Sequence, residues 1–417
     1  MRRSLFAFVA LVGLVACDNI TDPDEPGTPV NLSFAPCVGS QGAPTWFAFQ
    51  DGNGSWTRAT ATSSGAFNFT LSSGRGGIAT YAPGDGLFVL YATTAELQAN
   101  VPSCSGTVRN VSGTVTGYAS LDNIRILMNN SQATVFGSQA APAPFTLDAV
   151  ESNVSDLVAV RYRTSASAAT FEAFPTNVFI RRGVSGSSTP LIDFASGTEA
   201  GAPLQRSVTV TNLSAGEELQ LYSNIVTSTT VGNIAVYEAA SAISGGSVVA
   251  PFYGLAAAAN RLVSGESQSL AISATRTVNA TSESRFGALV YTDVADKQFT
   301  FGPSLGAVSI SGSSRPSASY SIQTGYDNLW DVVFEQGSGA SFRQLEVLMT
   351  RAYLGTGSMI TLAVPDLSGV SGFQSSWLLI PGSMADWSFL ATNGDLSILN
   401  NKAVAYVGAD RSSTFVP

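Results

Sequence analysis

The 417-residue sequence predicts an all-β protein built from tandem β-sandwich modules. Hydrophobic residues make up 45% of the chain and charged residues only 12%, so the sequence supplies ample material for buried cores. The apolar residues occur in short runs that alternate with polar ones, which is the pattern of half-buried strands. Glycine, of which there are 40, separates these runs as turns do. The length suggests two to four domains.

The first 16 residues have the layout of a secretory signal peptide. Arg2 and Arg3 precede an apolar stretch from Leu5 to Ala16, and a positive end before a short apolar core is typical of such signals. The core is shorter than the roughly 20 residues that span a bilayer. We therefore expect residues 1–16 to be removed and the rest of the chain to be extracytoplasmic.

The stretch Leu14-Val15-Ala16-Cys17 resembles the lipobox of bacterial lipoproteins. The resemblance implies a lipid on Cys17, cleavage just before it, and a protein anchored in the bacterial cell envelope, periplasmic or surface-exposed. Several acyl chains together give stable anchoring to a membrane. The acidic, proline-containing residues 17–29 are then a flexible tether. The alternative is an ordinary secretory signal in which Cys17 is incidental.

Residues 30–105 are expected to form a first, disulfide-bonded β-sandwich. An alternating run leads into Asp-Gly-Asn-Gly at 51–54, which is a strong hairpin signal. Further alternating runs follow at residues 66–71, 77–82 and 87–94. With Cys17 lipidated, Cys37 and Cys104 remain as an even pair, which predicts one disulfide in an exported protein. The bridge would stabilise the module by roughly 4 kcal/mol; the alternative is two free buried thiols.

The order of segments in residues 106–184 resembles the carboxypeptidase-regulatory-like, prealbumin-type β-sandwich. The resemblance depends on a glycine-containing first strand in 108–130, the segment Pro-Phe-Thr-Leu in 144–150, and an apolar strand in 156–164. It implies a sandwich that serves as a spacer or binding platform and is not catalytic.

Residues 189–417 are expected to form a C-terminal all-β region, with a further boundary near residue 312 where a Ser-, Gly- and Pro-containing stretch interrupts the strands. Residues 252–262 are the best helix candidate in this region. Residues 342–354 mix strand and helix periodicity, and we favour a strand there.

Charge and composition exclude several classes of function. Removal of Arg2 and Arg3 takes the formal net charge from −9 to −11, so nucleic acid is not an expected partner. The chain has no histidine, which excludes Ser-His-Asp and Cys-His catalysis and His-ligated zinc. Walker and dinucleotide glycine motifs are also missing. We therefore expect no catalytic residue, no cofactor and no metal site.

Carboxylate chemistry is the catalysis that this composition leaves open, because a glycosidase needs only two acids at the right separation. Asp327, Asp331 and Glu335 are spaced by four residues and can share a strand face. Asp293 and Asp296 lie in one loop. Most acids in this sequence stand in Gly-, Pro- or Ser-flanked stretches, where exposed carboxyls titrate near their reference values. We therefore expect no hydrolytic centre.

Two further patterns have an ordinary structural explanation. Asp51, Asn53 and Ser55 alternate as calcium ligands do, but the distal glutamate of such loops is missing and a hairpin turn explains the same residues. The tryptophans could stack on sugars, yet β-sandwiches bury their large side chains, so we expect most of them in cores. They are Trp46, Trp56, Trp330, Trp377 and Trp387.

Two functions stay open at this point. The first is a non-enzymatic structural or binding role at the cell envelope, with the membrane reached through the lipid anchor and a protein or glycan as partner. The alternative is a cell-surface carbohydrate-binding or carbohydrate-degrading protein. Exposed coplanar tryptophans, or two carboxyl groups facing each other in a cleft, would favour the alternative.

Overall fold

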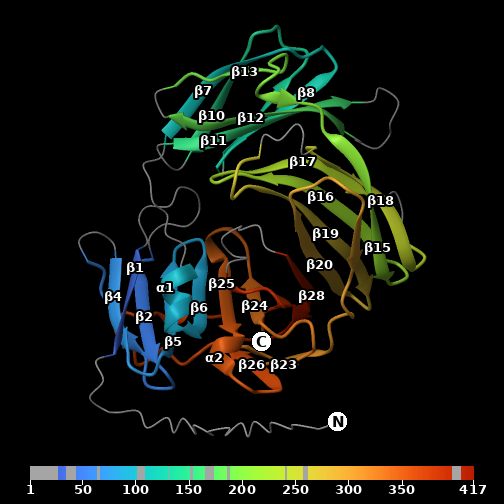
Figure 1. The fold of residues 1–417 in the computed structure, drawn as a ribbon. Helices are drawn as coiled ribbons and strands as arrows, with labels where there is room; N and C mark the ends of the chain where they lie inside the picture. The colour runs from blue at the N-terminus through green and yellow to red at the C-terminus, as the bar shows by residue number, and fades with distance from the viewer. Residues whose placement is uncertain are drawn as a thin grey trace, which may run out of the picture.

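The computed structural model consists almost entirely of β-strands arranged in several sheets (Figure 1). It describes residues 27–33, 44–62, 66–100, 109–129, 131–150, 154–164, 173–185, 188–239, 242–256, 262–396 and 405–417. The predicted all-β class with several β-sandwich modules is therefore confirmed. Among these described ranges, no helix has the length and apolar character needed to cross a bilayer.

The module at the top of Figure 1 is a sandwich of two sheets, with strand orders β10-β7-β13 and β14-β12-β11-β8-β9. Its strands are β7 (Arg109–Thr116), β8 (Asp122–Met128), β9 (Ser131–Phe136), β10 (Ala143–Val150), β11 (Val154–Thr164), β12 (Ala173–Ser185), β13 (Leu191–Asp193) and β14 (Ala200–Gly201). Val115, Ile126, Leu147 and Phe179 fill the core between the sheets. The predicted end at residue 184 falls short, because β13 pairs with β7 and β14 with β12.

A second sandwich follows along the chain. Its small sheet has the order β18-β15-β21, with β15 (Leu204–Leu213), β18 (Gly246–Gly254) and β21 (Lys297–Thr300). Facing it are β16 (Glu218–Val226), β17 (Val231–Glu238), β19 (Ser267–Val278) and β20 (Thr281–Tyr291). Val210, Leu221, Phe252 and Phe299 belong to the core between them.

A third body combines the N-terminal and C-terminal segments of the chain, which lie side by side in Figure 1. Its N-terminal elements are β1 (Thr28–Ser33), β2 (Trp46–Asp51), β3 (Thr57–Arg58), β4 (Ala66–Leu71), β5 (Arg75–Ala82), β6 (Gly86–Thr93) and α1 (Thr94–Asn100). Its C-terminal elements are β22 (Val308–Ser311), β23 (Ser317–Ser321), β24 (Leu329–Gln336), η2 (Gly339–Ser341), β25 (Arg343–Thr350), α2 (Arg351–Leu354), β26 (Met359–Ala363), η3 (Ser375–Trp377), β27 (Ala385–Thr392) and β28 (Tyr406–Phe415).

The two segments are joined by a parallel pairing of β6 with β25, in which Leu87 stands opposite Leu345 and Val89 opposite Val347. Gly86 makes this approach possible. Its φ is +85°, and a Cβ atom there would lie 2.2 Å from the backbone oxygen of Gln344. Only glycine fits such a position without strain.

One 12-stranded sheet runs through the second sandwich and the third body. Its strand order is β17-β16-β19-β20-β28-β27-β24-β25-β6-β5-β2-β3. The segment expected as a separate sandwich at 30–105 therefore shares its main sheet with the C-terminal region. Near the boundary expected at residue 312, the two cores do separate between β21 and β22, but the pairing of β20 with β28 continues the sheet across it. Strand patterns in a sequence do not reveal which distant strands pair.

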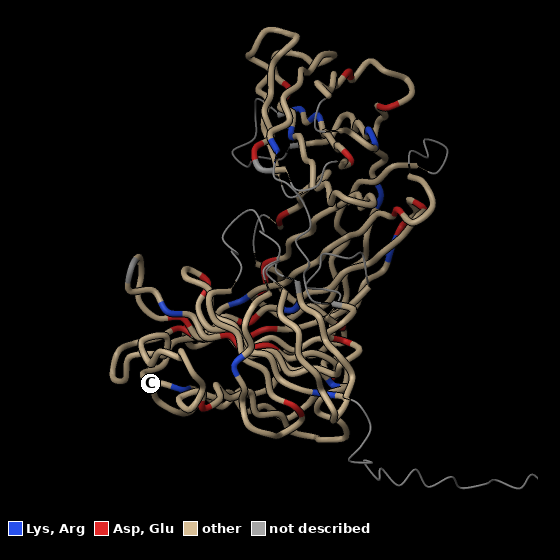
Figure 2. The backbone as a smooth tube through the Cα atoms, turned by 90° about the vertical axis from the view of Figure 1, so that its left-hand side faces the viewer, with Lys and Arg blue, Asp and Glu red and all other residues tan. Residues whose placement is uncertain are grey.

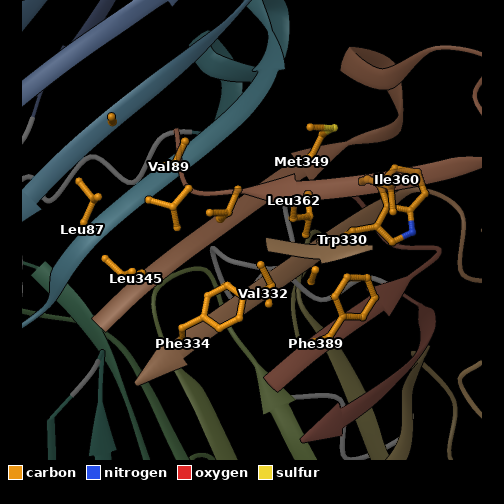
Figure 3. Close-up of a cluster of buried hydrophobic side chains, with 14 of the residues drawn as sticks. Leu87, Val89, Trp330, Val332, Phe334, Leu345, Met349, Ile360, Leu362 and Phe389 are labelled. Atoms are coloured by element: carbon orange, nitrogen blue, oxygen red, sulfur yellow. The ribbon is translucent and has the colours of Figure 1, made fainter. Parts of the chain in front are cut away.

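Small sheets cover the long sheet on different faces. The β22-β23-β26 sheet packs on one face of its centre, where Trp330, Val332 and Phe334 of β24 meet Ile360 and Leu362 of β26 (Figure 3). The β18-β15-β21 sheet covers the same face farther along. The β1-β4 sheet packs on the opposite face, over β2, β5 and β6.

The local predictions have mixed outcomes. The hairpin around 51–54 is confirmed, because β2 and β3 are antiparallel partners and Gly52 has φ +53°. The helix predicted at 252–262 is wrong for Phe252–Gly254, which complete β18, while 257–261 lie outside the described residues. The segment 342–354 is a strand as far as Thr350 and a short helix afterwards. The helix α1 was not expected.

Candidate functional site

The second face of β24, β25, β27 and β28 is only partly covered, and we term it the open face. Along β24, Trp330 and Phe334 are buried in the core. Between them Asp331 is half-buried, and farther along Glu335 is exposed. Because successive side chains of a strand point to opposite faces, Asp331 and Glu335 lie on the side away from the core.

Five carboxyl groups stand on the open face, namely Asp331, Glu335, Glu346, Asp386 and Asp410. The registers across β28, β27, β24 and β25 place them in three rows: Asp410–Leu390–Asp331–Leu348, Ser412–Ser388–Val333–Glu346 and Thr414–Asp386–Glu335–Gln344. These rows contain no lysine or arginine. Figure 2 shows acidic positions on neighbouring strands in the middle of the lower body. The open face is therefore a negatively charged surface that its own strands do not neutralise.

Asp331 and Glu346 form the most perturbed pair. Burial raises the pKa of Asp331 well above its ordinary value, and the nearby Glu346 carboxyl raises it further. The Oδ1 atom of Asp331 is buried and has no hydrogen-bond partner. Burial also raises the pKa of Glu346, whose Oε2 accepts a 3.4 Å hydrogen bond from Gln344 Nε2. Such a pair retains a proton at a pH where exposed carboxyls have lost theirs.

Asp410 is the third perturbed acid on the open face. Burial raises the pKa of Asp410 to about 6, although a hydrogen bond with Ser284 on the neighbouring strand partly opposes the shift. Asp410 and Asp331 are separated by one intervening strand, which corresponds to about 10 Å between their backbones. The open face thus carries three acids whose pKa values are raised by burial.

The structure brings together only two of the carboxylates that the sequence singled out. Asp331 and Glu335 do share one face of β24, whereas Asp327 lies before the strand begins. Asp293 accepts a hydrogen bond from Lys297 at 3.1 Å, and Asp296 accepts one from the backbone N–H of Ser207. These last two acids therefore have structural partners and do not form an acid pair.

Glu346 and Asp410 were missed by the sequence reasoning, which placed most acids in exposed turns. Both lie inside strands, so the expectation of ordinary titration behaviour does not hold for them. The available signal was a single carboxylate between apolar neighbours, as in Leu345-Glu346-Val347. Such a signal predicts an acid on the second face of a strand, but it does not tell which acids face each other.

The calcium-like pattern is a turn. Asp51 accepts hydrogen bonds from the backbone N–H groups of Ser72 and Ser73 and from the Ser73 hydroxyl, which ties the β2–β3 turn to the end of β4. Asn53 and Ser55 are exposed. In the part of the chain that the structure describes, no three His, Cys, Asp or Glu side chains are arranged to hold a metal ion.

None of the five tryptophans, all of which lie in described residues, is exposed. Trp46, Trp330 and Trp377 are buried, and Trp56 and Trp387 are half-buried. Trp377 stacks on Tyr81 with ring centroids 4.0 Å apart. The aromatic rings therefore stabilise the core of the third body and do not form a coplanar sugar-stacking surface.

The cysteines lie outside the described residues, so Cys17, Cys37 and Cys104 keep the status of predictions. The same holds for the signal peptide at 1–16 and most of the tether. In comparisons with known proteins, no family model matches the chain and no curated protein is significantly similar to it.

Proposed function

We propose that the mature chain is a lipid-anchored protein of the bacterial cell envelope that binds a partner through the open face and catalyses no reaction. The observation that carries the binding role is the concentration of five carboxyl groups, without a cation in their rows, on a partly uncovered sheet face. Surfaces of this kind select partners by charge. The lipobox-like stretch ending at Cys17 supports anchorage.

Anchorage is tested by replacing the lipid site. The Cys17→Ser variant should move from the detergent phase to the aqueous phase in a detergent-partitioning assay, because it cannot accept the lipid. A variant that still enters the detergent phase would show that the anchor assignment is wrong.

The disulfide is tested separately on the wild-type protein. Peptide mapping without reduction should yield one cross-linked pair containing Cys37 and Cys104. Two separately alkylated thiols from unreduced protein would contradict the pairing.

The non-enzymatic assignment rests on elimination. Without histidine as a general base, catalysis would depend on carboxylates alone. A panel of peptide, ester and glycan substrates should therefore show no turnover with the purified protein.

A carbohydrate-degrading function is the second candidate, and the Asp331–Glu346 pair is the observation that favours it. Glycosidases use one carboxyl with a raised pKa as the acid beside a second carboxylate, and the Glu346 carboxyl helps to raise the pKa of Asp331 here. The buried tryptophans argue against an extended sugar-stacking surface. Glycan hydrolysis that disappears in both Asp331→Asn and Glu346→Gln would make this candidate the leading one.

A further inference from the structure

Carboxylates that are buried elsewhere in the described chain have donors that compensate their charge. The fully buried ones are Asp122, Asp156, Glu217, Glu266 and Glu283. Arginine supplies the donor for four of them: Arg163 to Asp122, Arg285 to Glu217, Arg182 to Glu266, and Arg276 with Arg411 to Glu283. Asp156 accepts hydrogen bonds from the Gly183 N–H and the Ser228 hydroxyl. Arginine is thus the usual counter-charge for buried acids in this protein.

The open face departs from this rule. Asp331, Glu346 and Asp410 have no arginine or lysine contact within the described residues, and the buried Oδ1 of Asp331 lacks any hydrogen-bond partner. A buried acceptor without a donor is unfavourable and is rare in native structures. Within the described residues, these three acids therefore lack the arginine partner that four of the five fully buried carboxylates have.

We propose that the open face binds a Lys- or Arg-rich segment of a partner protein, whose cations neutralise Asp331, Glu346 and Asp410 as arginine does at four of the fully buried carboxylates. The inference rests on the proposed binding function and specifies the chemistry of the partner. It assigns the acids a role in recognition that needs no catalysis.

The spacing of the acids favours a chain of cations over a single metal ion. From β28 to β25 the acids extend over three strand spacings, or about 14 Å, and neighbouring rows are about 7 Å apart. One divalent ion needs its oxygen ligands within about 2.6 Å. Alternate residues of an extended segment are also separated by about 7 Å, so basic residues at every second position match the rows.

The test uses the mature lipoprotein purified in detergent and a fluorescent peptide of alternating Arg and Ser residues, with anisotropy measured at neutral pH and low ionic strength. The variant Asp331→Asn, Glu346→Gln, Asp410→Asn should lose about tenfold or more in affinity, since it removes the charges that the peptide neutralises. The matched control Asp148→Asn, Glu218→Gln, Glu238→Gln removes the same number of carboxyl groups at exposed positions on β10, β16 and β17, which are not strands of the open face, and should lose less than about threefold.

A second variant distinguishes a loss of binding from misfolding of the protein. Glu335→Gln with Asp386→Asn alters only exposed members of the open face and should weaken the peptide severalfold. Equal losses in the open-face and control variants, or no binding by the wild type, would overturn the inference. Calcium binding that depends on the open face, in place of peptide binding, would also overturn it.

A parallel measurement with a glycan array separates this inference from the proposed function. Neutral glycans that bind the wild type and not the open-face variant would refute the cationic partner, while leaving a binding role for the face. A Cys17→Ser variant that still enters the detergent phase would refute only the lipid anchor and would leave the binding role of the open face unchanged.

Discussion

Replacing Asp410 by asparagine should stabilise the protein at neutral pH. The amide has the shape of the carboxyl group and can keep the hydrogen bond with Ser284, but it carries no charge that must be held on the half-buried face. In the wild type, the ionised carboxylate of Asp410 destabilises the folded protein, because burial disfavours the charge and no described cation stands in its row.

The magnitude follows from the pKa of Asp410. Burial raises that pKa from an ordinary value of 3.8 to about 6 in the folded state. Each unit is worth about 1.4 kcal/mol, so the charged form destabilises the fold by about 3 kcal/mol, or about 2 kcal/mol after allowing for partial exposure. Because the pKa of Asp410 is raised in the folded state, the protonated carboxyl contributes its full stability below pH 4. This contribution is lost as the pH rises through about 6.

Urea unfolding followed by tryptophan fluorescence measures this effect, because all five tryptophans lie in the third body, which contains Asp410. At pH 7.5 the Asp410→Asn variant should unfold with a free energy about 2 kcal/mol higher than that of the wild type, and at pH 3.5 the two should agree. Asp386→Asn, an exposed change on the adjacent strand, should differ by less than about 0.5 kcal/mol. A variant that gains no stability at pH 7.5, or gains the same amount at both pH values, would refute the reasoning.

Two further variants test the β6–β25 pairing and the buried ion pair of Glu217 with Arg285. Gly86→Ala should lower the unfolding free energy by about 2 kcal/mol more than Gly84→Ala, because both have positive φ but only Gly86 meets the backbone of Gln344; equal losses in urea unfolding would contradict the tight β6–β25 approach. Glu217→Gln should cost about 3–5 kcal/mol, since it leaves the buried guanidinium of Arg285 without its counter-charge, and thermal unfolding followed by circular dichroism should show a clear drop in the midpoint.

The all-β class and many individual strands could be predicted from local patterns. Alternation fixes which residues of a segment face the core, as in Trp330, Val332 and Phe334 of β24. Turn chemistry marks the β2–β3 hairpin at 51–54 for the same reason, because Asp-Gly and Asn-Gly act through their own backbone conformations. These properties belong to a few neighbouring residues and need no knowledge of the rest of the chain.

The predictions that failed are those in which tertiary contacts override the local conformational preference of the sequence or give a residue its significance. Residues 252–254 belong to a region with helical character in the sequence, yet they complete β18 because pairing with β15 satisfies their backbone and places Phe252 in a core. Likewise, Glu346 was not recognised as part of a site, because its significance depends on Asp331 lying on the adjacent strand.

The sequence by itself therefore determined the fold class, the absence of histidine chemistry, and the expectation of export and lipid anchorage at Cys17. Only the tertiary structure decided that β6 joins β25 and that Asp331, Glu346 and Asp410 stand on one open face. The physical reason is that strand order and register are set by packing over the whole molecule, and a sheet brings together residues that are far apart along the chain.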